Sequence, residues 1–270
     1  YWKLHAARFN AAGVDFGYDC FAPVPRFGES RTLPTLWRAF LPDVVLDDHG
    51  YPSQEWVQPF AGYNSPPYFR TSWWMPNALI YGIHRWLDPE RFPANGAVQA
   101  GIRDALAERL TADQEIAAYS ARLLERYVTY AQRYVPEKFP LELHRGFVSQ
   151  VGSIAAGPDA RSFAGRFPHI TAAELVTEVP DETAQGSYLA LCARAHLEGD
   201  LAVCHYLAAH PQPVVRRQPM ASVSAVPTIQ DPRVKMSSLR SATEMHSSGG
   251  MRPRVAWLKR SSASAPHRRC

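Results

Sequence analysis

The stretch DVVLDDHGYPSQEW, residues 43–56, decides the fold class of this chain. Its short apolar run is bounded by a proline and a glycine, and this pattern predicts a buried β-strand over residues 40–48. The strand ends in two aspartates and His49. Acidic residues and glycine are typical of the exit from a strand into a loop, but a strand end is also a rigid place from which to present a metal ligand.

The imidazole of His49 is a candidate zinc ligand, because neutral histidine binds zinc readily. The carboxylate of Asp48 or of Asp47 would then orient the ring by accepting a hydrogen bond from its other nitrogen. The alternative is a loop histidine that hydrogen-bonds to the backbone, and the strand pattern by itself favours that alternative. The four cysteines form no Cys-x-x-Cys pair, so a cysteine zinc site is not expected.

The composition is that of a folded domain with a separate basic tail. Hydrophobic residues make up 46% of the 270 residues, which supports a core, and no apolar run is long enough to span a membrane. Residues 211–270 hold eleven Lys and Arg against two acidic residues, a charge of +9, which leaves −5 for residues 1–210 within the total of +4. The mildly acidic body gives no reason to expect a nucleic-acid partner. Periodicity disappears after residue 210, so we expect a domain over 1–210 and a disordered, low-complexity tail over 211–270.

Apolar periodicity predicts helices in the middle of the chain and a second strand in its last third. Apolar residues three and four apart indicate the helices, and Thr111 with Gln114 matches a capping box at the start of the longest one. Segments rich in glycine, proline and aromatic residues are expected to be loops. In chain order we expect loops and short strands over 1–40, a strand over 40–48, an ordered loop over 51–74, helices over 76–87, 98–110 and 111–135, a strand over 170–180, and a helix over 181–209 with breaks at Gly186 and Gly199.

Strands that alternate with helices predict an α/β fold, with a mixed sheet flanked by helices. Open sheets of this class bind ligands beyond the carboxyl ends of their strands, where the pattern places His49 and Glu178. Glu178 follows a β-branched run and precedes Pro180, and a carboxylate there is suited to act as a general base on a metal-activated water. A solvated strand-exit residue is the alternative, and Glu174 and Glu182 are competing carboxylates.

Three segments, taken together and in this order, resemble the carboxypeptidase A-like zinc metallopeptidases. The segment RFNAAGVDFGYD (8–19) is similar to that family's Arg-x-Asn…Gly-Val-Asp-x-Asn-Arg-Asn segment. PDVVLDDHGYPSQEW (42–56) is similar to the strand that delivers the third zinc ligand, and ITAAELVTEVPD (170–181) to the strand that bears the catalytic glutamate. The resemblance covers about residues 1–209 and implies a carboxypeptidase-like fold.

The resemblance implies a zinc-dependent peptidase or amide hydrolase. His49 would bind Zn²⁺ beside a His-x-x-Glu pair, and Glu178 would be the general base. The metal would polarise the scissile carbonyl and lower the pKa of a bound water, while an arginine matching Arg8 would stabilise the oxyanion. The residues expected behind the ligand or against the substrate are Asp48, Glu55 and Tyr18.

The chain also departs from the family. No histidine has a glutamate three residues away, so the His-x-x-Glu pair is missing, and we expect an N-terminally truncated fragment with weak zinc binding and little activity of its own. Gly17 and Tyr18 stand where the family has the Asn-Arg pair that grips a peptide's terminal carboxylate. The expected substrate is therefore a peptide with an unusual terminus or a small amide.

Two other functions stay open at this point. The same fold could be a non-catalytic binding module with the aromatic loop 51–74 as its contact surface; a His-x-x-Glu segment ahead of Tyr1 would favour the enzyme instead. A third reading is an unrelated α/β hydrolytic enzyme in which Asp47, Asp48 and His49 bind a different metal. No Gly-x-Ser-x-Gly elbow and no phosphate-binding loop occurs in the sequence. The sequence gives no indication of the cellular location.

Overall fold

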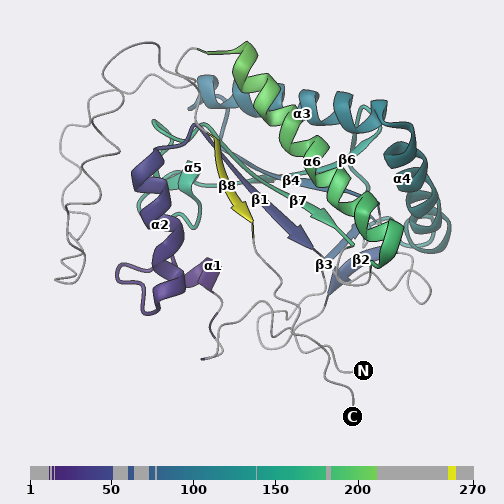
Figure 1. The fold of residues 1–270 in the computed structure, drawn as a ribbon, viewed down its shortest axis with the longest axis horizontal. Helices are drawn as coiled ribbons and strands as arrows, with labels where there is room; N and C mark the ends of the chain where they lie inside the picture. Colours follow the sequence, from purple (N-terminus) through teal and green to yellow (C-terminus); the bar gives the residue numbers. More distant parts are fainter. Residues whose placement is uncertain are drawn as a thin grey trace.

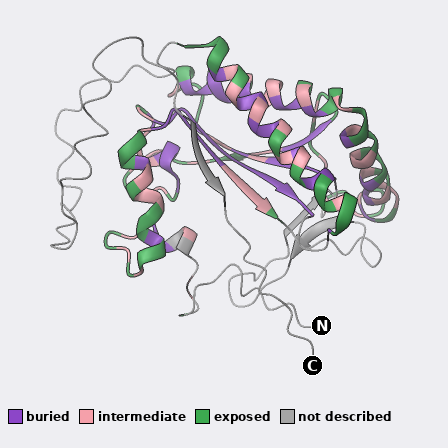
Figure 2. Cartoon of the chain, viewed as in Figure 1, coloured by how far each residue is buried: buried purple, intermediate pink, exposed green. Residues whose placement is uncertain are grey.

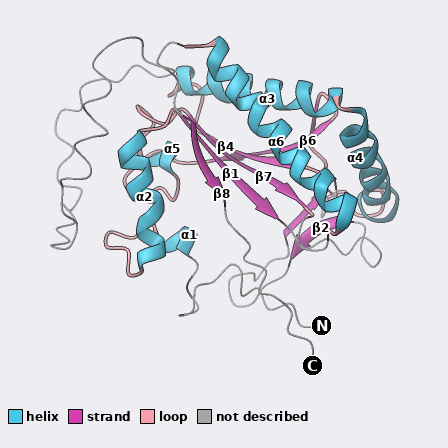
Figure 3. Ribbon diagram, viewed as in Figure 1, coloured by secondary structure: helices cyan, strands magenta, loops and turns pink. Residues whose placement is uncertain are grey.

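A mixed six-stranded sheet forms the centre of the molecule, and helices lie against both of its faces (Figure 1 and Figure 3). This arrangement confirms the expected α/β fold with a mixed sheet flanked by helices. The computed structural model describes residues 12, 14, 16–50, 60–63, 73–76, 78–137, 139–180, 184–211 and 255–259.

The strand order of the sheet is β5-β6-β4-β7-β1-β8. β7 runs parallel to β1 and antiparallel to β4, so the central strands have mixed directions. β2 and β3 form a separate antiparallel pair. The strands are β1 (Val44–Gly50), β2 (Phe60–Tyr63), β3 (Trp73–Pro76), β4 (Tyr81–Trp86), β5 (Leu143–His144), β6 (Phe147–Ser153), β7 (Ala173–Val179) and β8 (Val255–Lys259).

The helices divide between the two faces of the sheet. α3 and α6 cover one face and enclose the largest hydrophobic core, whereas α2 and α5 cover the other face around Trp37 and Phe163. Buried positions accordingly line the sheet and the inner sides of the helices (Figure 2). The helices are α1 (Phe16–Asp19), α2 (Gly28–Phe40), α3 (Pro93–Ala112), α4 (Gln114–Tyr127), the π-helix η2 (Val128–Gln132), α5 (Phe163–Arg166) and α6 (Gly186–Ala209).

Side chains of β1 alternate between these two faces, as in any strand. Leu46 belongs to the core beneath α3 and α6, and Val45 belongs to the cluster beneath α2. Further along the same two series, Asp48 lies on the α6 face, and Asp47 and His49 lie on the α2 face. This alternation decides which of the polar residues at the end of β1 can meet.

The predicted helix over 76–87 is wrong, because these residues contain the strand β4. Its Tyr81 pairs with Glu178 of β7, so β4 lies in the interior of the sheet. A short apolar run in an interior strand cannot be told from a buried helix segment by periodicity. The strands β5 and β6 were not predicted either.

The helix α2 occupies residues 28–40, where loops and short strands were predicted, whereas most of residues 1–15 fall outside the described residues. It contains Pro34, and it buries Trp37, whose indole N–H donates a hydrogen bond to the Thr171 hydroxyl at 2.8 Å. The Trp37 ring also stacks on Phe167, with 4.2 Å between the ring centroids. Packing of one aromatic face therefore outweighs a composition that is typical of loops.

The predicted strand over 170–180 is confirmed as β7, and the predicted helices over 98–110 and 181–209 are confirmed as α3 and α6. The capping box at Thr111 is wrong, since Thr111 lies within α3 and the side chain of Asp113 caps α4. α6 begins at Gly186 and runs through Gly199 without a break.

Residues 211 and 255–259 are the part of the basic tail that the structure describes. Residues 255–259 form β8, which pairs in parallel with β1 at one edge of the sheet, although the sequence predicted disorder there. The rest of that prediction falls outside the described residues. Among the described helices, none combines the length and the apolar character needed to cross a bilayer.

Candidate functional site

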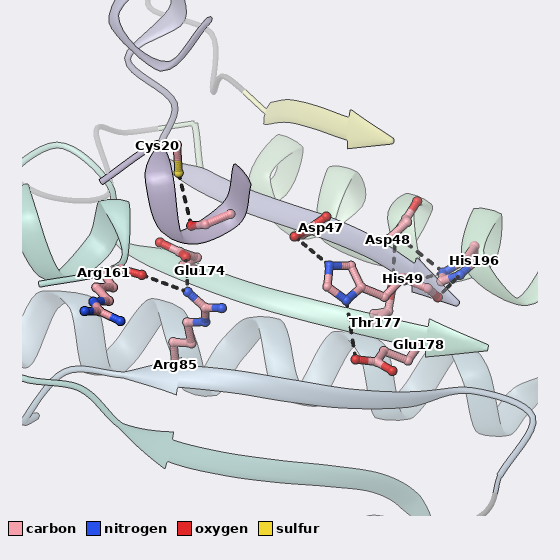
Figure 4. Close-up of polar contacts among 11 residues, drawn as sticks. Cys20, Asp47, Asp48, His49, Arg85, Arg161, Glu174, Thr177, Glu178 and His196 are labelled. Atoms are coloured by element: carbon pink, nitrogen blue, oxygen red, sulfur yellow. Dashed lines mark hydrogen bonds and ion pairs between the residues drawn. The ribbon is translucent and has the colours of Figure 1, made fainter. Parts of the chain in front are cut away.

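His49 and Glu178 lie side by side on two adjacent parallel strands. In the register of the sheet His49 of β1 pairs with Glu178 of β7, and Glu178 pairs with Tyr81 of β4. A single rung of the sheet thus aligns an imidazole, a carboxylate and a phenol. The two residues that the sequence placed at strand ends come together on the α2 face, as Figure 4 shows.

Both nitrogens of the His49 ring face carboxylates. Nε2 lies 2.8 Å from Oδ2 of Asp47, and Nδ1 lies 3.5 Å from Oε1 of Glu178 (Figure 4). Asp47 contacts the ring because residues two apart on a strand share a face. The carboxylate that orients the imidazole is therefore Asp47 and not Asp48, which the sequence analysis also considered.

These contacts change the proton affinity of His49. Burial alone lowers the pKa of the imidazole, but the hydrogen bonds and negative charges of Asp47 and Glu178 raise it more, to about 9. Without a metal, the ring therefore carries a proton on each nitrogen at neutral pH and bridges two carboxylates. A cation that replaces the Nδ1 proton would occupy the same electrostatic position.

Tyr81 holds the second oxygen of Glu178. Its hydroxyl donates a hydrogen bond to Oε2 at 2.8 Å, and both residues are buried. The Oε1 atom is left facing His49. Sequence reasoning missed Tyr81, because residues 76–87 were assigned to a helix and only strand pairing brings its hydroxyl to this carboxylate.

On the opposite face of β1, Asp48 joins a second polar cluster. Its Oδ1 accepts a hydrogen bond from the Thr177 hydroxyl at 3.0 Å and lies 3.5 Å from Nδ1 of His196 on α6. Nε2 of His196 lies 3.1 Å from the backbone oxygen of His49. No sequence pattern points to His196, since its partners are distant in the chain.

Glu174, a competitor of Glu178 in the sequence, is engaged in structural contacts. Its Oε2 accepts hydrogen bonds from the backbone N–H groups of Phe163 and Ala164, and its Oε1 meets the Arg85 guanidinium at 2.8 Å. Burial raises the pKa of this carboxyl despite these contacts. Glu174 therefore anchors α5 to the sheet and is not available to a ligand.

The atoms around His49 fit one part of a zinc site. A carboxylate on one ring nitrogen, with the other nitrogen turned toward the site, is the arrangement that commonly supports a metal-binding histidine. Within the described ranges no group of three or more His, Cys, Asp or Glu is placed to hold a metal ion. These residues therefore supply one imidazole and one adjacent carboxylate, whereas a catalytic zinc site uses three protein ligands.

Four further residues considered from the sequence have no side chain that the structure describes. Arg8 and Glu55, and the competitor Glu182, fall outside the described residues. Tyr18 belongs to the short helix α1, where the structure describes only its backbone. Their expected roles stay predictions.

Comparison of the chain with protein-family models, with curated proteins and with solved structures finds no match. The site must therefore be judged on its geometry and on the chemistry of its residues.

Proposed function

We propose that this chain contributes to a zinc-dependent amide hydrolase of the carboxypeptidase A-like metallopeptidase kind. The observation that carries the proposal is the pairing of His49 with Glu178, an imidazole and a carboxylate delivered to one point by two strands far apart in the sequence. Both residues occupy the positions at which the resemblance expects a zinc ligand and a general base.

In this proposal His49 binds the metal through Nδ1, while Asp47 accepts a hydrogen bond from the Nε2–H group and fixes the orientation of the ring. The resemblance implies a His-x-x-Glu pair as the other ligands, and no such pair occurs in this sequence, so the chain itself would supply His49. When bound, Zn²⁺ supplies Lewis-acid activation of the scissile carbonyl and of the attacking water.

Glu178 takes the proton from the attacking water and returns it to the leaving amine. Tyr81 fixes the carboxylate by its contact with Oε2, so Oε1 is the atom presented to the reacting groups. Because Glu178 is buried, its side chain needs this support to stay in a single orientation. Arg8 is proposed to stabilise the oxyanion.

The substrate class follows from the residues at 17 and 18. Gly17 and Tyr18 replace the Asn-Arg pair with which the family grips a terminal carboxylate. We therefore propose a peptide with an unusual terminus or a small amide as the substrate, and a carboxypeptidase-like fold as the framework.

The test compares zinc content and amidase activity in the wild-type protein and in its His49→Ala and Glu178→Gln variants. Loss of bound zinc is expected in the first variant. In the second, zinc content should be kept and turnover should fall by at least 100-fold, since a general base contributes about 10²–10⁴. Glu174→Gln serves as a control carboxylate on the same strand. Unchanged zinc in His49→Ala together with full activity in Glu178→Gln would end the assignment.

One observation favours a second candidate, a non-catalytic binding module with this fold. Both nitrogens of His49 already face carboxylates, and the described residues offer no third metal donor. In that case the cluster would be a structural ion pair, and the wild-type protein would purify without zinc. The same measurement therefore separates the two functions.

A further inference from the structure

A polar cluster lies behind His49, on the α6 face of the sheet. It joins His196 of α6 to Asp48 of β1 and Thr177 of β7 (Figure 4). Nδ1 of His196 lies 3.1 Å from the Thr177 hydroxyl, and Nε2 lies 3.1 Å from the backbone oxygen of His49. The imidazole of His196 therefore connects the helix to the last residues of β1, just before the strand ends at Gly50.

The two nitrogens of the His196 ring have different partners. A backbone oxygen can only accept a hydrogen bond, so Nε2 of His196 carries the proton in this contact. Thr177 and Asp48 occupy the Nδ1 side of the same ring. The Thr177 hydroxyl donates to Asp48 and faces helix α6, not the side of His49 and Glu178.

The helix that carries His196 is firmly held in the core. On either side of His196 along the helix, α6 buries Cys192, Ala195 and Gly199. The ladder between β1 and β8 ends at Asp48, one residue before His49, whereas the ladder between β1 and β7 continues to Gly50. The contact from His196 is thus a support from α6 at the end of the strand.

We propose that His196 is a positioning residue for the His49 site. By donating to the His49 carbonyl it fixes the backbone from which the imidazole projects, and so keeps the ring between Asp47 and Glu178. Asp48 and Thr177 in turn hold the His196 ring at its Nδ1 side. The inference rests on the proposed zinc site and adds a residue that lies on the opposite face of the sheet.

The test uses three variants of the full chain. His196→Leu removes the donor, whereas His196→Gln can keep an N–H near the position of Nε2. His205→Leu is the control, because His205 lies on the same helix but is exposed and contacts Arg109. Zinc affinity is measured by competition with a chelating dye, and the His49 ring of the metal-free chain is observed by long-range ¹H–¹⁵N NMR.

We expect His196→Leu to weaken zinc binding about tenfold, at the lower end of the effect of removing a supporting contact. His196→Gln should recover most of this loss, and His205→Leu should bind zinc like the wild type. In the metal-free chain, His196→Leu should also shift the His49 ring signals and weaken the hydrogen-bonded Nε2–H resonance. Equal zinc affinity in wild type and His196→Leu, or no rescue by glutamine, would overturn the proposal.

Failure of the proposed zinc site can be distinguished from failure of the positioning role of His196. If His49→Ala binds zinc as the wild type does, the proposed function fails, and the metal-free spectra then decide the role of His196. Unchanged His49 signals in a folded His196→Leu variant overturn the positioning role; a shift confined to that variant supports it.

Discussion

The buried histidine of β4, His84, gives a prediction about acid stability that is independent of any metal. Its side chain is 2% exposed, and its Nε2 atom has no hydrogen-bond partner among the described residues. Burial, reinforced by the positive charges of Arg103 and His144, lowers the pKa of His84 to about 3. The folded protein therefore keeps this ring neutral at pH values where the unfolded chain is protonated.

The sign and size of the effect follow from the two pKa values. Between the unfolded value of 6.5 and the folded value of about 3, only the unfolded chain binds the proton, so the free energy of unfolding falls as the pH falls. Each pKa unit corresponds to about 1.4 kcal/mol, so the loss reaches about 2 kcal/mol at pH 5 and about 4 kcal/mol at pH 3. Above pH 6.5 the group has no effect on the pH dependence.

The perturbation is His84→Leu, which removes the titrating group and puts an apolar side chain of similar size in its place. Urea unfolding followed by circular dichroism at several pH values between 7.5 and 4.5 measures the free energy of unfolding. The variant should lose about 2 kcal/mol less than the wild type between pH 7 and pH 5. His169→Leu is the matched control, because His169 is exposed and should leave the acid dependence unchanged.

Two results would refute this reasoning. The first is an identical pH dependence for the wild type and His84→Leu. The second is an NMR titration of the folded wild type in which the His84 ring takes up its proton above pH 5, and it applies even if the leucine variant does not fold.

Three further predictions concern the site and its support. Tyr81→Phe should leave zinc content unchanged but lower amidase turnover about tenfold, since one oxygen of Glu178 loses its hydrogen bond; equal turnover would contradict the role of Tyr81. Gly165→Ala should destabilise the fold by about 1–3 kcal/mol in urea unfolding, because the added Cβ would lie 2.6 Å from Ser162 Oγ and 3.1 Å from a backbone oxygen. Gly28 has open space around it, so Gly28→Ala should not cause this destabilisation. In the metal-free protein, protonated His49 should raise the free energy of unfolding by up to about 3 kcal/mol. This contribution is fully present below pH 6.5 and is lost as the pH rises through about 9, and His49→Gln should abolish that alkaline loss.

The approach of His49 to Glu178 could be predicted from sequence, but the choice of Asp47 as the second partner of the ring required the structure. The apolar run before it, bounded by proline and glycine, is a strong local signal for β1. The choice between Asp47 and Asp48 depends on whether the strand continues through His49, and the prediction ended it at residue 48. Because β1 extends to Gly50, period-two alternation places Asp47 beside the ring and Asp48 behind the sheet.

The contacts of Tyr81 and His196 are tertiary and leave little trace in the sequence. Tyr81 reaches Glu178 only when β4 pairs with β7, and the apolar run around it is compatible with either helix or strand. α6 was predicted as a helix, but no local pattern indicates that His196 meets a carbonyl of β1. Pairing register and helix docking are properties of the whole sheet, so single-sequence periodicity does not report them.

The most direct test of the account is a zinc titration of the chain, observed at the His49 ring by ¹H–¹⁵N NMR. We predict that Zn²⁺ replaces the proton on Nδ1 and releases it to solvent, while Nε2 keeps its proton toward Asp47. Signals of His169 should not change in the same titration. Zinc that leaves the His49 ring unaltered, or that binds equally well to His49→Ala, would contradict the central claim.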